Sequence, residues 1–284
     1  MNTNVNNITP KNQEQLRNIL ETIHASYHKK ELVSPDPLQF LYDYPEKDGQ
    51  REIAAIIAAM LAYGRVEQII KAVSTVLSIM NNAPYDYLQN RVTADIAKNF
   101  SDFRYRFTNG NHIANFLNAI KANLSQYGSL QTTFMSGLKS EDIKNKNIIP
   151  AMCSFVQKLS SKGETAHLTP DPAKGSACKR LNLFLRWMVR KDEVDPGGWD
   201  EIPPDMLIIP LDTHMHHAGK LLGFTKRKQA NMKTALEITE GFRKICPEDP
   251  VKYDFSLTRF GIHPDMNVKT LEATVSALYQ NPVF

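Results

Sequence analysis

The chain has 284 residues, 42% hydrophobic and 23% charged, a composition typical of a globular domain large enough to bury a core. The net charge of +4 comes from 34 basic and 30 acidic residues, an excess too small to identify a nucleic-acid partner. No stretch approaches the roughly 20 apolar residues of a membrane helix, and the polar start "MNTNVNNITPKNQ" lacks a signal-peptide pattern. We therefore expect a cytoplasmic protein that needs neither a membrane nor an obligate protein partner.

Apolar residues recur with a helical period along most of the chain. Between Leu16 and Tyr27 they follow an i, i+3, i+4, i+7 spacing, and "REIAAIIAAMLAYG" predicts a buried helix that ends at Gly64. No period-2 alternation and no hairpin turn between β-branched runs is found, so the sequence predicts an all-α fold of about a dozen helices. Further helices are expected over 66–80, 112–128, 140–160, 176–191, 228–245 and 267–280, with long Pro-, Gly- and Asp-rich connections over 160–175 and 191–210.

The three cysteines, Cys153, Cys178 and Cys246, lie far apart in the sequence. An odd and scattered set argues against a disulfide framework. It also excludes an iron–sulfur or zinc site made of four cysteines of this chain. We expect no cofactor.

The stretch 176–191, "SACKRLNLFLRWMVRK", predicts an amphipathic helix with one strongly basic side. At 100° per residue, its apolar side chains gather on one side, and a narrow arc on the other holds Lys179, Asn182, Arg186 and Arg190. A solvated helix face is one interpretation. Because like charges four residues apart repel each other, the alternative is a surface that binds a polyanion.

An acidic residue and three histidines follow the apolar run that ends at Pro210, in "LDTHMHH". A helical pattern runs from Thr213 to Leu222, with Asp212 before it and Gly223 after it. Asp212 is therefore predicted to be the N-cap residue and Gly223 to end the helix. An N-cap carboxylate has a second oxygen, which can face a cleft and take part in chemistry.

The histidines raise the question of a metal. His214 and His217 are spaced to share a helix face and could bind a metal together with Asp212, whereas His216 points elsewhere. No HExxH pattern is present, and no further ligand beyond Asp212 can be named. The favoured interpretation is a site without metal, in which one histidine packs beside Asp212.

The last two segments together resemble the helix-hairpin-helix superfamily of DNA glycosylases, above all endonuclease III and the archaeal 8-oxoguanine glycosylase. "GSACKRLNLFL" places Lys179 and Asn182 at the spacing of the superfamily's hairpin lysine and asparagine, and "LDTH" supplies its aspartate as Asp212, 33 positions after Lys179. The stretch 58–68 resembles the early helix and turn that push a side chain into DNA, and 254–262 a late helix that packs behind the site. The whole chain also resembles a bacterial family of unknown function that is distantly related to these glycosylases.

The resemblance implies a helix-hairpin-helix glycosylase-like fold with two helical lobes and a cleft between them. Residues 1–284 would form one two-lobed unit, with 50–178 in one lobe and 1–49 plus 179–284 in the other. DNA would be the partner, Lys179 and Asp212 the catalytic residues, and Trp187 and His214 the base pocket. The nucleic-acid-binding residues would be Tyr63, Arg65, Lys174, Gly175, Arg180, Arg186 and Arg190, with Tyr63 or Arg65 as the inserted side chain.

The sequence departs from the superfamily in two respects. The hairpin glycines are reduced to Gly175, in "AKGSACK", and such glycines let backbone N–H groups approach a phosphate closely. The iron–sulfur cluster of endonuclease III is also excluded by the cysteine count.

The implied reaction breaks an N-glycosidic bond and so places positive charge on the sugar. A carboxylate beside C1′ stabilises that charge, and a neutral amine can attack C1′ and form a Schiff base. Lysine has a reference pKa of about 10.4, so a nucleophilic lysine must be desolvated or lie beside other cations, for which Arg180 and Arg186 are candidates.

Three functions fit these features. We expect a base-excision-repair-like N-glycosylase, with or without Schiff-base lyase activity. The first alternative is a non-catalytic nucleic-acid-binding protein with a decayed glycosylase site. The second is a metal-dependent hydrolase that uses the histidine cluster, or a pure interaction protein.

Overall fold

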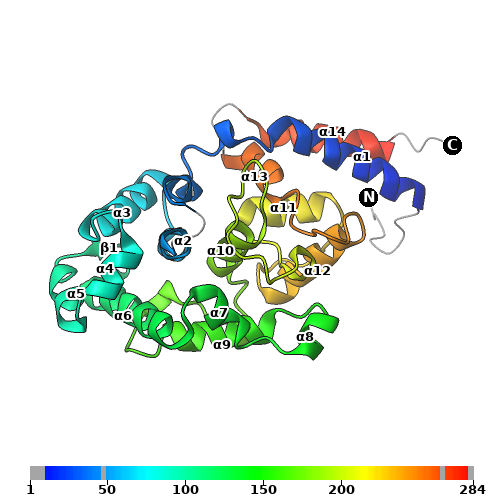
Figure 1. Ribbon diagram of the computed structural model, residues 1–284. Helices are drawn as coiled ribbons and strands as arrows, with labels where there is room; N and C mark the ends of the chain where they lie inside the picture. Colours follow the sequence, from blue (N-terminus) through cyan, green and yellow to red (C-terminus); the bar gives the residue numbers. More distant parts are fainter. Residues whose placement is uncertain (1–9, 46–48, 263–265, 281–284) are drawn as a thin grey trace.

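The computed structural model describes residues 10–45, 49–262 and 266–280, and the chain is predominantly helical there (Figure 1), which confirms the predicted all-α class. None of the helices described is both long and apolar enough to cross a membrane. The α-helices are α1 (Pro10–Tyr27), α2 (Gln50–Leu61), α3 (Val66–Ile79), α4 (Pro84–Asn90), α5 (Thr93–Asn99), α6 (Gly110–Tyr127), α7 (Leu130–Met135), α8 (Ser140–Lys144), α9 (Ile149–Leu159), α10 (Lys179–Val189), α11 (Thr213–Leu221), α12 (Met232–Arg243), α13 (Asp254–Ile262) and α14 (Val268–Gln280). Short 3-10 helices lie between them: η1 (Lys30–Leu32), η2 (Pro37–Asp43), η3 (Ala166–Leu168), η4 (Pro172–Lys174) and η5 (Pro204–Met206).

Two expectations about local structure are corrected. The stretch 140–160 was expected to be one helix and forms two, α8 and α9, because Pro150 lacks an N–H and is accepted only in the first turn of a helix. A hairpin is present where none was expected, since β1 (Arg104–Tyr105) pairs antiparallel with β2 (Thr108–Asn109). Each strand has two residues, too few for a period-2 pattern to be recognised.

The buried helix α2 organises the packing. Every side chain from Ile53 to Leu61 is at most 1% exposed, and four of these residues are alanines, whose small side chains let neighbouring helices pack closely. α2 contacts α10, α3, α4 and η2, and Figure 1 shows it between α3 and α10. This contact fixes α10, which carries part of the candidate site.

Both ends of the chain pack against the last third of the molecule. α1 contacts α13, and α13 also contacts α11 and α14. Lys252 Nζ and the Tyr253 hydroxyl, just before α13, each lie 2.7 Å from Glu21 Oε1 in α1. These contacts hold α11 and α13, which form another part of the site.

Candidate active site

A cavity of about 570 Å³ lies between segments that are distant in the sequence. Its wall is formed by α10, the start of α11, α13, the turn between α2 and α3, and the segment 35–37. A volume of this size is typical of sites that bind one small molecule or one chemical group of a larger ligand.

Lys179 and Asp212 meet at this cavity. Lys179 Nζ lies 3.3 Å from Asp212 Oδ2, and the two side chains are 37% and 15% exposed. Both residues line the cavity, so solvent and a ligand can reach the pair. The structure thus brings together the amine and the carboxylate that the resemblance singled out, while their role in catalysis stays a prediction.

The local structure explains how Asp212 is oriented. Its Oδ1 accepts the N–H of Met215 at 2.8 Å, so the predicted N-cap role is confirmed. Because one oxygen caps α11, the other is directed to Lys179, the first residue of α10. Gly223 has a φ of 73° just past the end of α11, as expected of a residue that ends a helix.

The three histidines of α11 diverge from one another. His214 lines the cavity and packs against Gly261 of α13, where a Cβ would lie 2.0 Å from His214 Nδ1. His216 Nε2 lies 3.0 Å from a backbone carbonyl oxygen, and His217 Nε2 lies 2.9 Å from a glutamate carboxylate of α14. Over the described ranges, no group of three or more His, Cys, Asp or Glu side chains is arranged to hold a metal.

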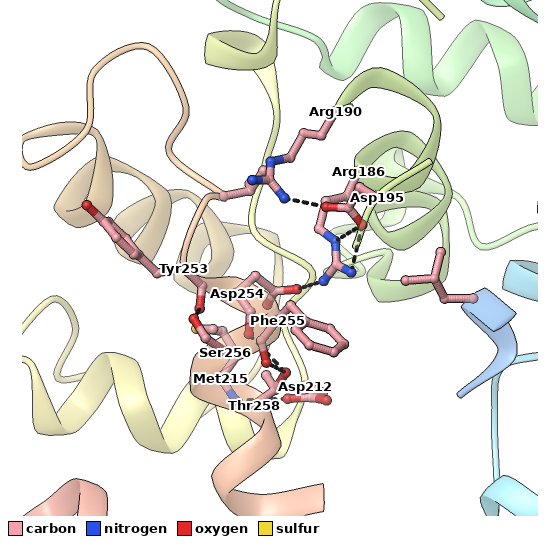
Figure 2. A network of polar contacts seen from close by, with 12 residues as sticks. Arg186, Arg190, Asp195, Asp212, Met215, Tyr253, Asp254, Phe255, Ser256 and Thr258 are labelled. Carbon is pink, nitrogen blue, oxygen red and sulfur yellow. Dashed lines mark hydrogen bonds and ion pairs between the residues drawn. The ribbon is translucent and has the colours of Figure 1, made fainter. Parts of the chain in front are cut away.

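The basic stripe of α10 faces the protein interior beyond its first turn, contrary to the prediction that Arg186 and Arg190 bind nucleic acid. These two arginines are 3% and 5% exposed. Figure 2 shows Arg186 bonded to Asp195 and Asp254, and Arg190 bonded to Asp195. Arg190 Nε also donates to Asp249 at 2.8 Å. Buried carboxylates, and not a polyanion, therefore relieve the repulsion along the stripe.

The buried ion pairs do not fully offset the cost of burying the charge of Asp254. Burial alone would lower the pKa of Arg186, but Asp195 and Asp254 outweigh it and raise that pKa. Burial raises the pKa of Asp254 to about 6, although Arg186 acts to lower it. Arg186 also bonds Asp195, and the Oδ1 atom of Asp254 has no hydrogen-bond partner. Asp254 belongs to the cavity wall, which therefore contains a carboxyl that titrates near neutral pH.

Arg180 and Tyr63, both predicted to bind nucleic acid, make contacts that link parts of the fold. The Arg180 guanidinium donates to the backbone carbonyls of Met60 and His167, and burial lowers the pKa of Arg180. The Tyr63 hydroxyl lies 2.8 Å from Thr108 Oγ1 in the hairpin. Tyr63 therefore anchors the hairpin, so of the two predicted inserted side chains it is the one the structure disfavours.

Trp187, Arg65, Lys174 and Gly175 complete the predicted set. Trp187 lines the cavity but is 1% exposed, so no base can stack on its ring in this arrangement. Arg65 is exposed and follows Gly64, a cavity residue. Lys174 and Gly175 are exposed as well, in a connection that holds the 3-10 helices η3 and η4 between α9 and α10. The first α-helix of a helix-hairpin-helix motif is thus not formed directly before α10.

Two basic features of the cavity rim were not singled out from the sequence. Residues 226–228 are all exposed and lie just before Ala230, which lines the cavity. Arg104 and Arg106 are exposed in the hairpin, and a Cβ at Gly64 would lie 2.8 Å from Arg106 Nη1. The signals were the basic run "KRK" and the alternation of basic and aromatic residues in "RYRF".

Residues 36–263 match the family described as "Protein of unknown function (DUF2400)", and the chain belongs to this family. No curated protein and no solved structure matches the chain. The family match carries no link to the helix-hairpin-helix glycosylases.

We predict that Arg186→Met strongly destabilises the fold. The substitution leaves the buried carboxylates of Asp195 and Asp254, 0% and 2% exposed, without their main partner, which costs roughly 3–5 kcal/mol. Urea denaturation measures the loss. Arg65→Met, at an exposed position, is the matched control and should change the unfolding free energy by about 0.5 kcal/mol or less. Equal effects of the two substitutions would contradict the prediction.

The raised pKa of Asp254 predicts a pH-dependent contribution to stability. The pKa is about 6 in the folded protein against an ordinary value of 3.8, so between these values the folded protein holds a proton that the unfolded chain has released. Relative to Asp254→Asn, the wild-type protein should gain stability as the pH falls from about 6 to about 4, and lose that gain as the pH rises through 6. Between these pH values, the difference in unfolding free energy between the two proteins should change with pH at a rate that corresponds to about one bound proton. A difference that does not change with pH would refute this.

Proposed function

We propose that this protein is a DNA N-glycosylase of the base-excision-repair type that forms a Schiff base with the sugar from which it removes the base. The supporting observation is the Lys179–Asp212 pair, with an amine 3.3 Å from a carboxylate at a cavity of about 570 Å³. Excision from a duplex requires the nucleotide to leave the base stack and enter a pocket. The cavity volume is sufficient for one base.

The two side chains have different roles in this reaction. Lys179 loses a proton to solvent and its nitrogen attacks C1′, while the electrons of the glycosidic bond leave with the base, which takes up a proton. The Asp212 carboxylate stabilises the positive charge that develops at C1′. The nitrogen, now a positively charged ammonium bonded to C1′, releases a proton to solvent and regains its lone pair. The C1′–O4′ bond then breaks, O4′ takes up a proton, and that lone pair forms the C=N bond of the protonated Schiff base.

The exposed cations at the rim replace the buried arginines as candidates for binding phosphates. Arg65 and the hairpin arginines lie on the side of the turn between α2 and α3, and 226–228 lie before Ala230 on the side of α12. Lysine and arginine side chains in such positions bind the DNA backbone through charge, which makes the affinity depend on salt.

We predict that borohydride traps the protein covalently on duplex DNA that contains an abasic site. Lys179→Gln should abolish the adduct because it removes the attacking amine. Asp212→Asn should keep the fold, since asparagine is an equally good N-cap, and should slow base release from a duplex that still carries a damaged base by about 100- to 1000-fold, because the charge that develops at C1′ is no longer stabilised. Gel electrophoresis of the reduced mixture is the measurement. Lys144→Gln, an exposed lysine on α8 that does not line the cavity, is the control that should still be trapped.

The outcome that contradicts the proposal is equally clear. Wild-type protein that forms no adduct, and releases no base from duplexes with oxidised, deaminated or alkylated bases, is not a glycosylase of this kind.

A non-catalytic nucleic-acid-binding protein is the second candidate. It is favoured by the connection before α10, where Gly175 and two 3-10 helices stand in place of a glycine-rich hairpin between α-helices. In that case DNA affinity should fall steeply with salt and stay unchanged in Asp212→Asn, with no adduct under borohydride. Fluorescence anisotropy across a salt series measures this, and an affinity that does not depend on salt would exclude it.

A further inference from the structure

The hairpin of β1 and β2 exposes an aromatic side chain to solvent. In its register Arg104 pairs with Asn109 and Tyr105 with Thr108, so Arg106 and Phe107 form the two-residue turn. Phe107 is 69% exposed, the highest value among the exposed large hydrophobic residues of the described chain. A single exposed ring is common on protein surfaces, so the meaning of Phe107 depends on the residues around it.

Tyr63 and His167 hold the hairpin against the rest of the protein. The Tyr63 hydroxyl lies 2.8 Å from Thr108 Oγ1 and 3.1 Å from the Tyr105 carbonyl oxygen. The Tyr105 hydroxyl in turn donates to the Tyr63 carbonyl. The His167 ring contacts both Tyr63 and Phe107 edge to face, with centroids 4.5 and 5.5 Å away. Phe107 therefore lies in a hairpin whose position is fixed by contacts with Tyr63 and His167.

The tip of the hairpin lies at the rim of the cavity. Gly64 lines the cavity, and a Cβ placed on Gly64 would lie 2.8 Å from Arg106 Nη1 and 3.2 Å from the Tyr105 hydroxyl oxygen. A ligand that enters the cavity beside Gly64 from a larger molecule would bring the rest of that molecule against the hairpin.

The charge around Phe107 is suited to a polyanion. Arg104, Arg106 and Arg65 are exposed, and the guanidinium of Arg106 lies 5.6 Å from the centroid of the Phe107 ring. The segment 103–109, "FRYRFTN", has no acidic residue, although Asp102 precedes it and Glu67 lies in α3. Alternating cations and aromatic rings bind nucleic acids through phosphates and base stacking.

We propose that Phe107 inserts into the base stack of duplex DNA at the gap left when a nucleotide enters the cavity. Apolar side chains that enter a base step unstack it and kink the duplex, and filling the gap offsets part of the cost of extruding the nucleotide. This inference rests on the proposed function only in that DNA is the ligand of the cavity; it does not need the Lys179 chemistry.

The test uses a duplex with one tetrahydrofuran abasic analogue, which has a gap in the stack and cannot form a Schiff base. Phe107→Ala should weaken binding of the full-length protein by about 5- to 150-fold, the equivalent of about 1–3 kcal/mol for one stacked ring. Ile143→Ala is the matched control, because Ile143 on α8 is also exposed, at 41%, and does not line the cavity. It should leave the affinity unchanged.

A spectroscopic arm tests insertion directly. Trp187 and Trp199 are 1% and 3% exposed, so iodide quenching in Phe107→Trp reports on the new side chain. The gapped duplex should protect that side chain from iodide, and should not do so in Ile143→Trp.

Each outcome has a distinct meaning. Equal affinities of wild type and Phe107→Ala, with full iodide access in Phe107→Trp, overturn the inference and leave the proposed chemistry standing. Binding that depends on Phe107 without any borohydride adduct supports the inference while the glycosylase proposal fails. Wild-type protein that binds no duplex overturns the inference together with DNA as the ligand.

Discussion

The site depends on the buried ion pairs that hold α10 from within. Arg186 connects α10 to Asp254 at the start of α13 and to Asp195 in the connection after α10, and Arg190 also bonds Asp195. A charge at this depth costs several kcal/mol unless it is paired, so α10 is stable only in the orientation that satisfies both arginines. Lys179 lies on the same side of the helix, two turns before Arg186, and is thereby placed opposite Asp212.

One helix face thus has two environments. Its last two turns carry cations that neutralise buried aspartates, and its first residue carries a cation that solvent reaches at the cavity. Asp212 is held independently, because its N-cap bond to Met215 orients the carboxylate at the start of α11. Tertiary packing therefore positions Lys179, and local helix capping positions Asp212.

Local features could be predicted from the sequence because their causes are local. The apolar period located helices such as α2, α3 and α12, and the Asp212 and Gly223 pattern identified both ends of α11. Only the resemblance predicted that Lys179 and Asp212 lie close together, because no periodicity relates positions so far apart in the sequence.

The remaining features depend on partners that are remote in the sequence. Nothing in the sequence of 176–191 shows that its arginines face Asp249 and Asp254. A buried basic stripe therefore cannot be distinguished from an exposed one by the sequence of the helix alone. Tyr63 was expected to reach DNA because the stretch 58–68 resembles the early helix and turn of the glycosylases. Its contact with Thr108 could not be predicted, because the hairpin is too short to be recognised in the sequence. The exposure of Phe107 depends on the same short hairpin, although "RYRF" combines the residue types that contact nucleic acids.

The central claim is that Lys179 and Asp212 act together on a nucleotide held in the cavity. The most direct measurement is a crystal structure of the protein with duplex DNA that contains the tetrahydrofuran analogue. We expect the analogue in the cavity, with the atom equivalent to C1′ within about 3.5 Å of Lys179 Nζ and beside the Asp212 carboxylate. DNA bound on a surface away from the cavity, with the Lys179–Asp212 pair unoccupied, would contradict the account.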